Sequence, residues 1–329
     1  MLKMYQEQLG SGSAPEYWDE NWGRAELTQF FSDVRICEND PVFDVLMQKL
    51  RPDGLFLEGG CGPAQWVKYL ADRGYRAVGV DFAARTVARI HEVAPELDVR
   101  VADIAALPFA DGEVHSYYSG GVVEHIEGGP EAALREARRV LRPDGWFLCS
   151  VPDDSFLRRR LFRGAQTDRF DLEPKLSVRR VARTEEEPGS SQLAFFQYAF
   201  TEPEFTRLLE DAGFAVERTF GYSLVWGLME LPRFAALYRG AFAMASGLRD
   251  RLRGRNGGHR DDAAVAAAPP GQLATATATA VAPAAGSRSG DFLRRTLVKE
   301  DRQTPLVGPL INLLCEYGAY MRMFVARPR

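Results

Sequence analysis

Residues 55–81 constrain the fold of this chain more than any other stretch, because they read as a strand, a glycine-rich bend, a helix and a second strand. The apolar run Leu55–Leu57 is typical of a buried strand. The glycines within 58–62 allow a sharp bend and a close approach of a ligand to the backbone. Pro63 suits the first position of a helix, where its missing N–H is not needed. Because the apolar run 77–80 follows as a second strand, this pattern predicts a parallel sheet in an α/β fold.

The acid at the end of the second strand, Asp81, suggests a nucleotide-like ligand. In an open α/β sheet ligands bind at the carboxyl ends of the strands, where a carboxylate can accept hydrogen bonds from both ribose hydroxyls. A dinucleotide site needs a third glycine beside the pyrophosphate, but Gln65 occupies that position. Glu58 would repel a phosphate and suits the ammonium group of a methionine moiety. The motif therefore favours S-adenosylmethionine over a nicotinamide or flavin dinucleotide, and a tight turn without a ligand remains the alternative.

The composition restricts the class of protein. The chain has 329 residues, 46% hydrophobic and 26% charged, enough for one large domain or two small ones. The net charge of −4 gives no general reason to expect a nucleic-acid partner. The N-terminus lacks the apolar region of a signal peptide, and the long uncharged stretch 263–287 is rich in Ala, Pro and Thr and low in bulky apolar residues, so we expect no spanning helix. The four cysteines (Cys37, Cys61, Cys149 and Cys315) are scattered without a CxxC pair, so we expect no metal site and a cytoplasmic location.

Strands and helices continue to alternate through residue 152. We expect helices over 84–93 and 130–141, and strands over 97–102, 114–119 and 146–151. This alternation predicts a doubly wound, mostly parallel sheet with helices on both of its faces.

Two further strand ends face the same crevice as the first glycine bend. Asp103 ends the third strand, where its carboxylate can accept a hydrogen bond from an adenine amino group; a turn or helix-capping role is the alternative. Gly120 and Gly121 end the fourth strand and allow a ligand to lie against the backbone. We therefore expect all three strand ends to contribute to one ligand site.

These motifs, in this order, resemble those of the class I S-adenosylmethionine-dependent methyltransferases, and most closely their small-molecule "type 11" branch. The likeness covers about residues 50–152, with weaker likeness to about 221 and in the last strand. It implies a Rossmann-like seven-stranded sheet, mostly parallel with an antiparallel last strand. Pro63 and Ala64 depart slightly from the small residues common in the family. The matching residues are Glu58–Gly62, Asp81, Asp103 with Leu107–Phe109, Gly121–Ile126 and Val140–Gly145.

The resemblance also implies S-adenosylmethionine as the cofactor and a role for each matching position. The glycine loop would cradle the methionine part, Asp81 would hold the ribose, and Asp103 and Ile104 would touch the adenine. Gly121 and Val122 would lie near the methionine end. The predicted cofactor-binding residues are Glu58, Gly59, Gly60, Cys61, Gly62, Gln65, Asp81, Phe82, Asp103, Ile104, Gly120, Gly121 and Val122.

Two less regular regions are candidates for the acceptor side. The aromatic cluster around Tyr17 and Trp22 indicates either a helix packed on the core or a lid over the cofactor. Residues 153–200 carry arginines and aromatic residues, which indicate either a solvated face or a cap over the acceptor pocket. Tyr17, Trp22 and Tyr198 are the residues predicted to line that pocket.

A long insertion, residues 222–317, separates the expected sixth strand (214–220) from the expected final strand (318–326). An apolar segment followed by arginines suggests an interfacial helix on an anionic membrane, and packing on the core or on a dimer mate is the alternative. The expected regions are an N-terminal helical lid (1–40), the cofactor-binding core (41–152), an acceptor-side cap insertion (153–200), the last helix and sixth strand of the core (201–221), an apolar and basic helical insertion (222–262), a disordered Ala/Pro/Thr-rich linker (263–290) and a return helix with the final strand (291–329).

His125 is the predicted catalytic residue. Methyl transfer from a sulfonium needs alignment and exclusion of water, and an oxygen acceptor can also need a base near neutral pH. Of the four histidines, His125 alone follows directly on the proposed cofactor edge; capping the next helix or holding the Gly120–Gly121 turn is its alternative role. We therefore predict a methyltransferase that acts on a small-molecule acceptor. A lipid- or sugar-linked acceptor is one possibility, and an oxygen is the favoured acceptor atom. The alternatives are an NAD(P)-dependent oxidoreductase, disfavoured by Gln65 and Glu58, and a non-catalytic scaffold.

Overall fold

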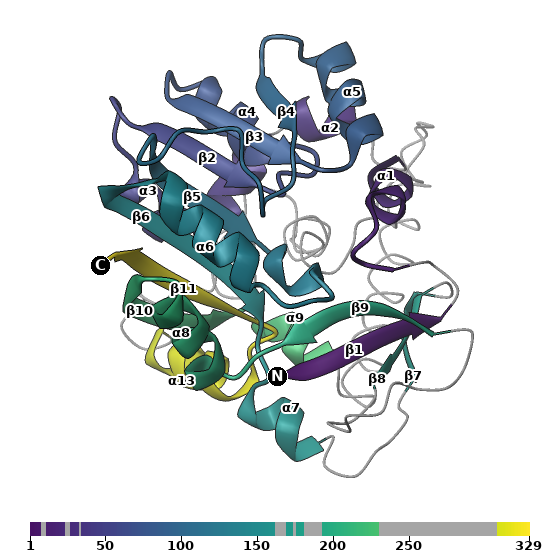
Figure 1. Ribbon diagram of the computed structural model, residues 1–329. Coiled ribbons are helices and arrows are strands. Elements are labelled where there is room, and N and C mark those ends of the chain that lie inside the picture. The colour runs from purple at the N-terminus through teal and green to yellow at the C-terminus, as the bar shows by residue number, and fades with distance from the viewer. Residues whose placement is uncertain are drawn as a thin grey trace, which may run out of the picture.

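The computed structural model describes the parts of the chain that form the core and the candidate site (Figure 1). The predicted disordered linker 263–290 and most of the predicted insertion 222–262 lie outside the described residues. The described residues are 1–7, 11–23, 27–32, 34–161, 169–173, 176–180, 193–229 and 308–329.

The core is a seven-stranded sheet in the order β10-β11-β6-β5-β2-β3-β4. Among these described strands β11 alone is antiparallel, and it lies between β6 and β10. The structure thus confirms the predicted Rossmann-like sheet with its antiparallel last strand. The strands are β2 (Leu55–Gly59), β3 (Arg76–Asp81), β4 (Asp98–Val101), β5 (Val114–Gly120), β6 (Leu141–Pro152), β10 (Phe214–Tyr222) and β11 (Met321–Pro328).

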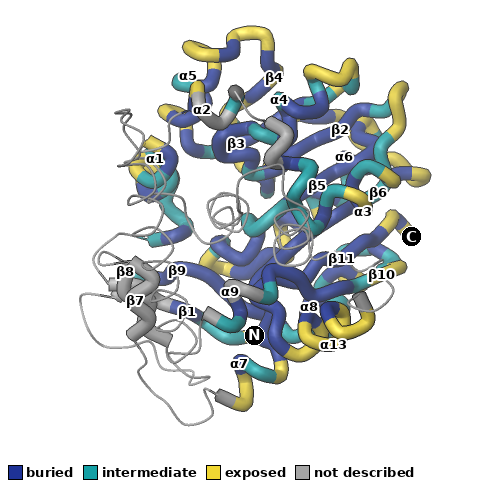
Figure 2. Tube along the Cα trace, turned by 180° about the vertical axis from the view of Figure 1, so that it is seen from behind, coloured by how far each residue is buried: buried dark blue, intermediate teal, exposed yellow. Residues whose placement is uncertain are grey.

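Helices cover both faces of this sheet because its side chains alternate between two apolar layers. Leu55 and Leu57 of β2 pack in the layer that includes α6 and α8, whereas Phe56 packs in the opposite layer with α3 and α4. Figure 2 shows the central strands as buried segments between these helices. The helices are α3 (Phe43–Lys49), α4 (Gln65–Ala71), α5 (Ala84–Val93), α6 (Glu131–Val140) and α8 (Glu202–Asp211).

A second, four-stranded antiparallel sheet has the order β7-β8-β1-β9. Figure 1 shows β1 and β9 side by side, next to the core sheet. Its strands are β1 (Leu2–Glu7), β7 (Arg169–Glu173), β8 (Leu176–Arg180) and β9 (Leu193–Ala199).

The predicted lid (1–40) is purely helical, whereas the observed N-terminal region also contains a strand. Helices α1 (Pro15–Gly23) and α2 (Leu27–Ser32) agree with that prediction, and the short helix η1 (Val34–Asn39) follows them. The first residues instead form β1, because β8 and β9 hydrogen-bond to both of its edges. These partners lie more than 160 residues away in the sequence, so no local pattern announces the strand.

Two local boundaries also differ from the sequence prediction. Helix α4 begins at Gln65 and not at Pro63, because Ala64 adopts a left-handed conformation with φ of 58°. Strand β6 begins at Leu141 and not at residue 146 as expected, because Leu141 pairs with Val114 and Trp146 with Ser116, and the intervening residues bulge out. In both places the backbone of the neighbouring segment decides the boundary.

The C-terminal helix α13 (Gly308–Gly318) leads directly into β11. It packs against β10, α7 (Phe156–Leu161) and α9 (Leu224–Met229). Within the described ranges, none of the helices has both the length and the apolar character to cross a lipid bilayer. Helix α13 thereby connects α7 and α9 with β10, the edge strand of the core sheet.

Candidate functional site

A cavity of about 240 Å³ lies at the carboxyl ends of the core strands. The ends of β3, β5 and β6 form one side of it, and α1 and β9 contribute to the other. This is the edge at which an open α/β sheet binds its ligands. The predicted cofactor residues that line the cavity are Gly60, Asp81, Phe82, Asp103, Ile104, Gly120, Gly121 and Val122.

The glycine bend and Asp81 form one rigid unit at this edge. The N–H of Gly62 donates to Asp81 Oδ2 at 2.8 Å, and the N–H of Ala83 donates to Oδ1 at 2.9 Å. A carboxylate has about four acceptor positions, so the N–H groups of Gly62, Ala83 and Phe82 still leave capacity for a ligand. Gly60 has φ of +71°, and a Cβ there would lie 2.4 Å from Val122 Cγ1. Only glycine therefore fits where the bend meets the end of β5.

Burial also affects the pKa of this acid. Asp81 is 5% exposed, and burial raises the pKa of its carboxyl above the usual value, although the N–H groups of Ala83 and Gly62 counteract that shift. A carboxylate held in this way is prepared for partners that donate hydrogen bonds.

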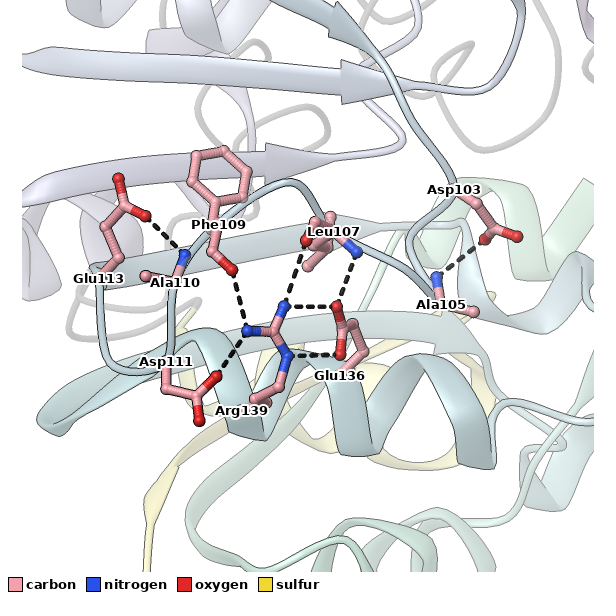
Figure 3. A network of polar contacts seen from close by, with 9 residues as sticks. All are labelled: Asp103, Ala105, Leu107, Phe109, Ala110, Asp111, Glu113, Glu136 and Arg139. Carbon is pink, nitrogen blue, oxygen red and sulfur yellow. Dashed lines mark hydrogen bonds and ion pairs between the residues drawn. The ribbon is translucent and has the colours of Figure 1, made fainter.

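The loop after β4 is fastened to α6 by Arg139 (Figure 3). The guanidinium of Arg139 donates to the carbonyl oxygens of Phe109 at 2.9 Å and Leu107 at 3.2 Å. At the start of the loop, Asp103 Oδ1 accepts the N–H of Ala105 at 2.8 Å. Asp103 thus makes the turn foreseen as its alternative role, and its side chain still borders the cavity.

The remaining predicted cofactor residues lie behind the bend and do not line the cavity. Glu58 is 5% exposed, burial raises the pKa of its carboxyl, and its Oε2 has no hydrogen-bond partner in the described part of the chain. The same holds for Gln65 Nε2. A Cβ at Gly59 would lie 2.3 Å from the Tyr117 hydroxyl, so close packing excludes a side chain there. Gly59, Cys61 and Gly62 are thus part of the bend but not of the cavity lining.

His125 lies in the short helix η2 (Val123–His125) and borders the cavity. Its Nδ1 is 2.7 Å from the carbonyl oxygen of Phe196. Because a carbonyl oxygen can only accept, Nδ1 carries the proton and Nε2 keeps a free lone pair. Burial lowers the pKa of His125 to about 4. The imidazole is therefore neutral at pH 7, with Nε2 unprotonated.

The N-terminal segment fastens the His125 loop to β9. The hydroxyl of Ser13 donates to the carbonyl oxygen of His125 at 2.5 Å, and Gly12 N–H donates to Phe195 at 2.8 Å. The indole N–H of Trp18 donates to the carbonyl oxygen of Gly12 at 2.8 Å. The rings of Trp18 and His125 meet edge to face with centroids 4.8 Å apart. The sequence prediction missed this segment because its partners are distant in the chain.

Glu124 is a second residue that the sequence prediction missed. Its side chain borders the cavity, is 1% exposed, and leaves Oε2 without a hydrogen-bond partner among the described residues. Burial raises the pKa of this carboxyl to about 8. Its Oε1 lies 4.0 Å from His125 Nε2. The signal in the sequence was an acid directly beside the candidate base, after a strand that ends in two glycines.

The aromatic wall differs in part from the prediction. Of the three residues predicted to line the acceptor pocket, Trp22 lines the cavity, whereas Tyr17 and Tyr198 lie outside the lining. The Tyr198 hydroxyl donates to the carbonyl oxygen of Glu127 at 2.5 Å. The register of β9 shifts between Gln197 and Phe195, so that Phe196 bulges and its side chain enters the wall. Bulges re-aim side chains in this manner, and strand alternation alone does not reveal them.

Comparisons with known proteins match the part of the chain that forms the core sheet. Residues 57–149 match a family model described as a methyltransferase domain, Methyltransf_11. A probable S-adenosylmethionine-dependent methyltransferase from Mycolicibacterium smegmatis is 33% identical over 175 residues, which is 53% of this chain and 57% of that protein. A malonyl-[acyl-carrier protein] O-methyltransferase from Erwinia pyrifoliae is 27% identical over 164 residues, which is 47% of this chain and 59% of that protein.

The chain thus spans less than two thirds of the length of these curated relatives. Among solved structures, an S-adenosylmethionine-dependent methyltransferase from Mesorhizobium loti is similar with a TM-score of 0.42 and 17% identity, covering 61% of this chain and 93% of that one. The [4+2]-cyclase SpnF is similar with a TM-score of 0.41 and 14% identity, covering 87% of this chain and 78% of that one.

Proposed function

We propose that this chain, whose residues 57–149 are a class I S-adenosylmethionine-dependent methyltransferase domain of the type 11 branch, transfers a methyl group to a small-molecule acceptor. One observation supports this most. The matched segment supplies the glycine bend, Asp81, Asp103 and His125, and all four border the same cavity. The relatives' activity is thereby connected to a physical site in this chain.

The residues around the cavity fit the proposed cofactor. S-adenosylmethionine supplies an activated methyl group on a sulfonium cation. Within the described lining, the side chains that carry a carboxyl group are Asp81, Asp103 and Glu124, and Glu124 has an unpartnered buried oxygen. We assign the ribose to Asp81 and the adenine to Asp103 and Ile104. The methionine part belongs to the glycine bend and to Gly121.

For the acceptor we propose an oxygen on an uncharged small molecule. His125 Nε2 is the free base at the cavity, and the neutral imidazole can take the proton that a hydroxyl loses. The wall beside it is aromatic, with Trp18, Trp22, Phe196 and Tyr320 in the lining. The described lining contains no lysine or arginine that would attract a phosphate or carboxylate. A lipid- or sugar-linked acceptor suits this wall where its reacting part is uncharged.

Binding and turnover experiments separate this function from its two alternatives. Calorimetry should show binding of S-adenosylmethionine and none of NAD, and Asp81→Asn should weaken the first because a ribose contact is lost. Binding of NAD instead would support the oxidoreductase alternative. Labelled methyl transfer into a small-metabolite extract should produce a labelled product. Cofactor binding without a labelled product from any acceptor pool would favour the scaffold alternative.

We also propose that the chain makes peripheral contact with an anionic membrane through 222–262, and that it is otherwise cytoplasmic. The described part of the chain offers one supporting feature, an apolar stripe on α13 beside the exposed Arg159 and Arg160 of α7. All four cysteines are free, as the reducing cytoplasm allows. Pelleting with anionic vesicles should fall when 222–262 is replaced by a short linker; equal pelleting would refute the contact. The exposed stripe consists of Leu310 (54%), Leu313 (55%), Leu314 (44%) and Tyr317 (52%).

A further inference from the structure

We propose that Glu124 is the counter-ion of the cavity, a carboxyl that stays protonated in the free protein and ionises when a cationic methyl donor enters. This inference rests on the proposed function, because it concerns the same cavity. It deepens that function by assigning to Glu124 the discrimination between the cationic donor and its neutral product. It also assigns to Glu124 the support of His125 as the base.

The position of Glu124 is the first argument. The side chain is buried at the carboxyl end of β5, one residue before His125, and Oε2 has no partner within the described structure. A buried carboxyl oxygen without a partner is unfavourable unless a ligand satisfies it. A Cβ at Gly121 would lie 3.5 Å from Glu124 Oε1, so the carboxyl lies over the glycine that directly follows β5. The proposed function assigns the methionine part of the cofactor to this glycine.

The electrostatic surroundings are the second argument. The titratable groups that face Glu124 are His125 on η2 at 4.0 Å and Cys149 on β6, and neither is a cation in the free protein. Asp81 and Asp103 share the cavity, and the described lining contains no basic side chain other than His125. Burial without a counter-charge holds the pKa of Glu124 at about 8. A cation inside the cavity supplies the missing charge and favours ionisation.

The consequence for His125 follows from the same geometry. Once Glu124 is ionised, its carboxylate lies 4.0 Å from His125 Nε2 and stabilises the imidazolium that forms when His125 takes the acceptor's proton. The carboxylate thus balances one positive charge in the cavity before the reaction and one on His125 after it. Glu124 acts through His125 and through the charge of the donor, so we describe it as a positioning residue.

The experiment measures proton release on binding and needs no turnover. Calorimetry of the full-length protein in buffers of different ionisation enthalpy gives the number of protons released when S-adenosylmethionine or S-adenosylhomocysteine binds. With S-adenosylmethionine, the affinity of the wild type should rise about tenfold per pH unit as pH approaches 8, and then level off. With the neutral S-adenosylhomocysteine, Glu124 contributes no such rise.

Variants separate Glu124 from other titrating groups. The amino group of the ligand titrates equally with wild type and Glu124→Gln, so the difference between the two proteins reports Glu124 alone. We expect that difference to approach about one proton near pH 7 for the cationic ligand and none for the neutral one. Asp103→Asn is the matched control, since it also removes an acid from the cavity but should retain the pH dependence.

The possible results are distinguishable. If S-adenosylmethionine does not bind the wild type, the proposed function fails. If it binds with the same proton release in wild type and Glu124→Gln, the function stands and the role of Glu124 is refuted. Should Glu124→Gln not fold, the wild-type comparison of the two ligands still decides, because equal pH dependence of both affinities would contradict the inference.

Discussion

Replacing Gly60 by alanine tests the central claim that the glycine bend and the end of β5 are packed against each other. The new Cβ would lie 2.4 Å and 2.5 Å from the two methyl carbons of Val122. Relieving such a collision costs about 1–3 kcal/mol. The left-handed backbone at φ +71° adds about 1–2 kcal/mol for a residue with a Cβ. We therefore expect Gly60→Ala to lower the free energy of unfolding by about 2–5 kcal/mol.

Gly74→Ala is the matched control for this substitution. Gly74 also has a positive φ, +80°, but a Cβ there would meet nothing within 4 Å. It should therefore cost only the backbone contribution of about 1–2 kcal/mol. Urea denaturation of both variants gives the difference, which isolates the collision with Val122. Calorimetry should further show that Gly60→Ala loses affinity for S-adenosylmethionine while Gly74→Ala retains it. Equal destabilisation by the two substitutions would refute the packing argument.

Three further predictions concern the base and the acid of the cavity. His125→Ala should lower kcat at least about 100-fold with unchanged cofactor affinity, whereas exposed His91→Ala should not; unchanged turnover in the first would exclude His125 as the base. Gly12→Ala would place a Cβ 2.2 Å from the Phe196 carbonyl that orients His125, so kcat should fall and cofactor affinity should not, while Gly23→Ala, which has open space, is the control. The raised pKa of Glu124, about 8 in the folded state against 4.5 unfolded, predicts stability that is present below pH 4.5 and lost as pH rises to 8. In urea denaturation between pH 6.5 and 8, the free energy of unfolding of the wild type should therefore decrease by up to about 1.4 kcal/mol per pH unit because of Glu124. Glu124→Gln should remove this decrease; an unchanged decrease in the variant would contradict the buried, protonated state.

Much of the core could be predicted because its signals are local. The predicted helix 84–93 coincides with α5, and the strands over 114–119 and 146–151 lie within β5 and β6. Apolar periodicity and turn residues determine such elements over a few residues. The boundaries at 63–65 and 142–145 could not be predicted in this way, since backbone conformation and cross-strand register decide them.

The candidate site, like the fold, could be predicted only in part. Parallel strands bring their carboxyl ends to one edge, so the neighbourhood of Asp81, Asp103 and Gly121 could be predicted once the alternation was recognised. The opposite wall could not. It depends on the pairing of β1 with β9, in which Leu2 lies opposite Ala199, and on the bulge that turns Phe196 into the cavity. The sequence prediction therefore chose Tyr198, two residues away on the same strand.

The sequence alone determined the sheet, the glycine bend and the order of the strand ends, because these follow from patterns a few residues long. Only the tertiary structure decided the protonation of Glu124 and His125. The same two side chains exposed to water would titrate near their ordinary values. In the folded chain both are buried beside an uncharged wall, so the pKa of Glu124 is raised to about 8 and that of His125 is lowered to about 4. Loss of water around a charge is a property of the packed cavity, and no stretch of sequence encodes it locally.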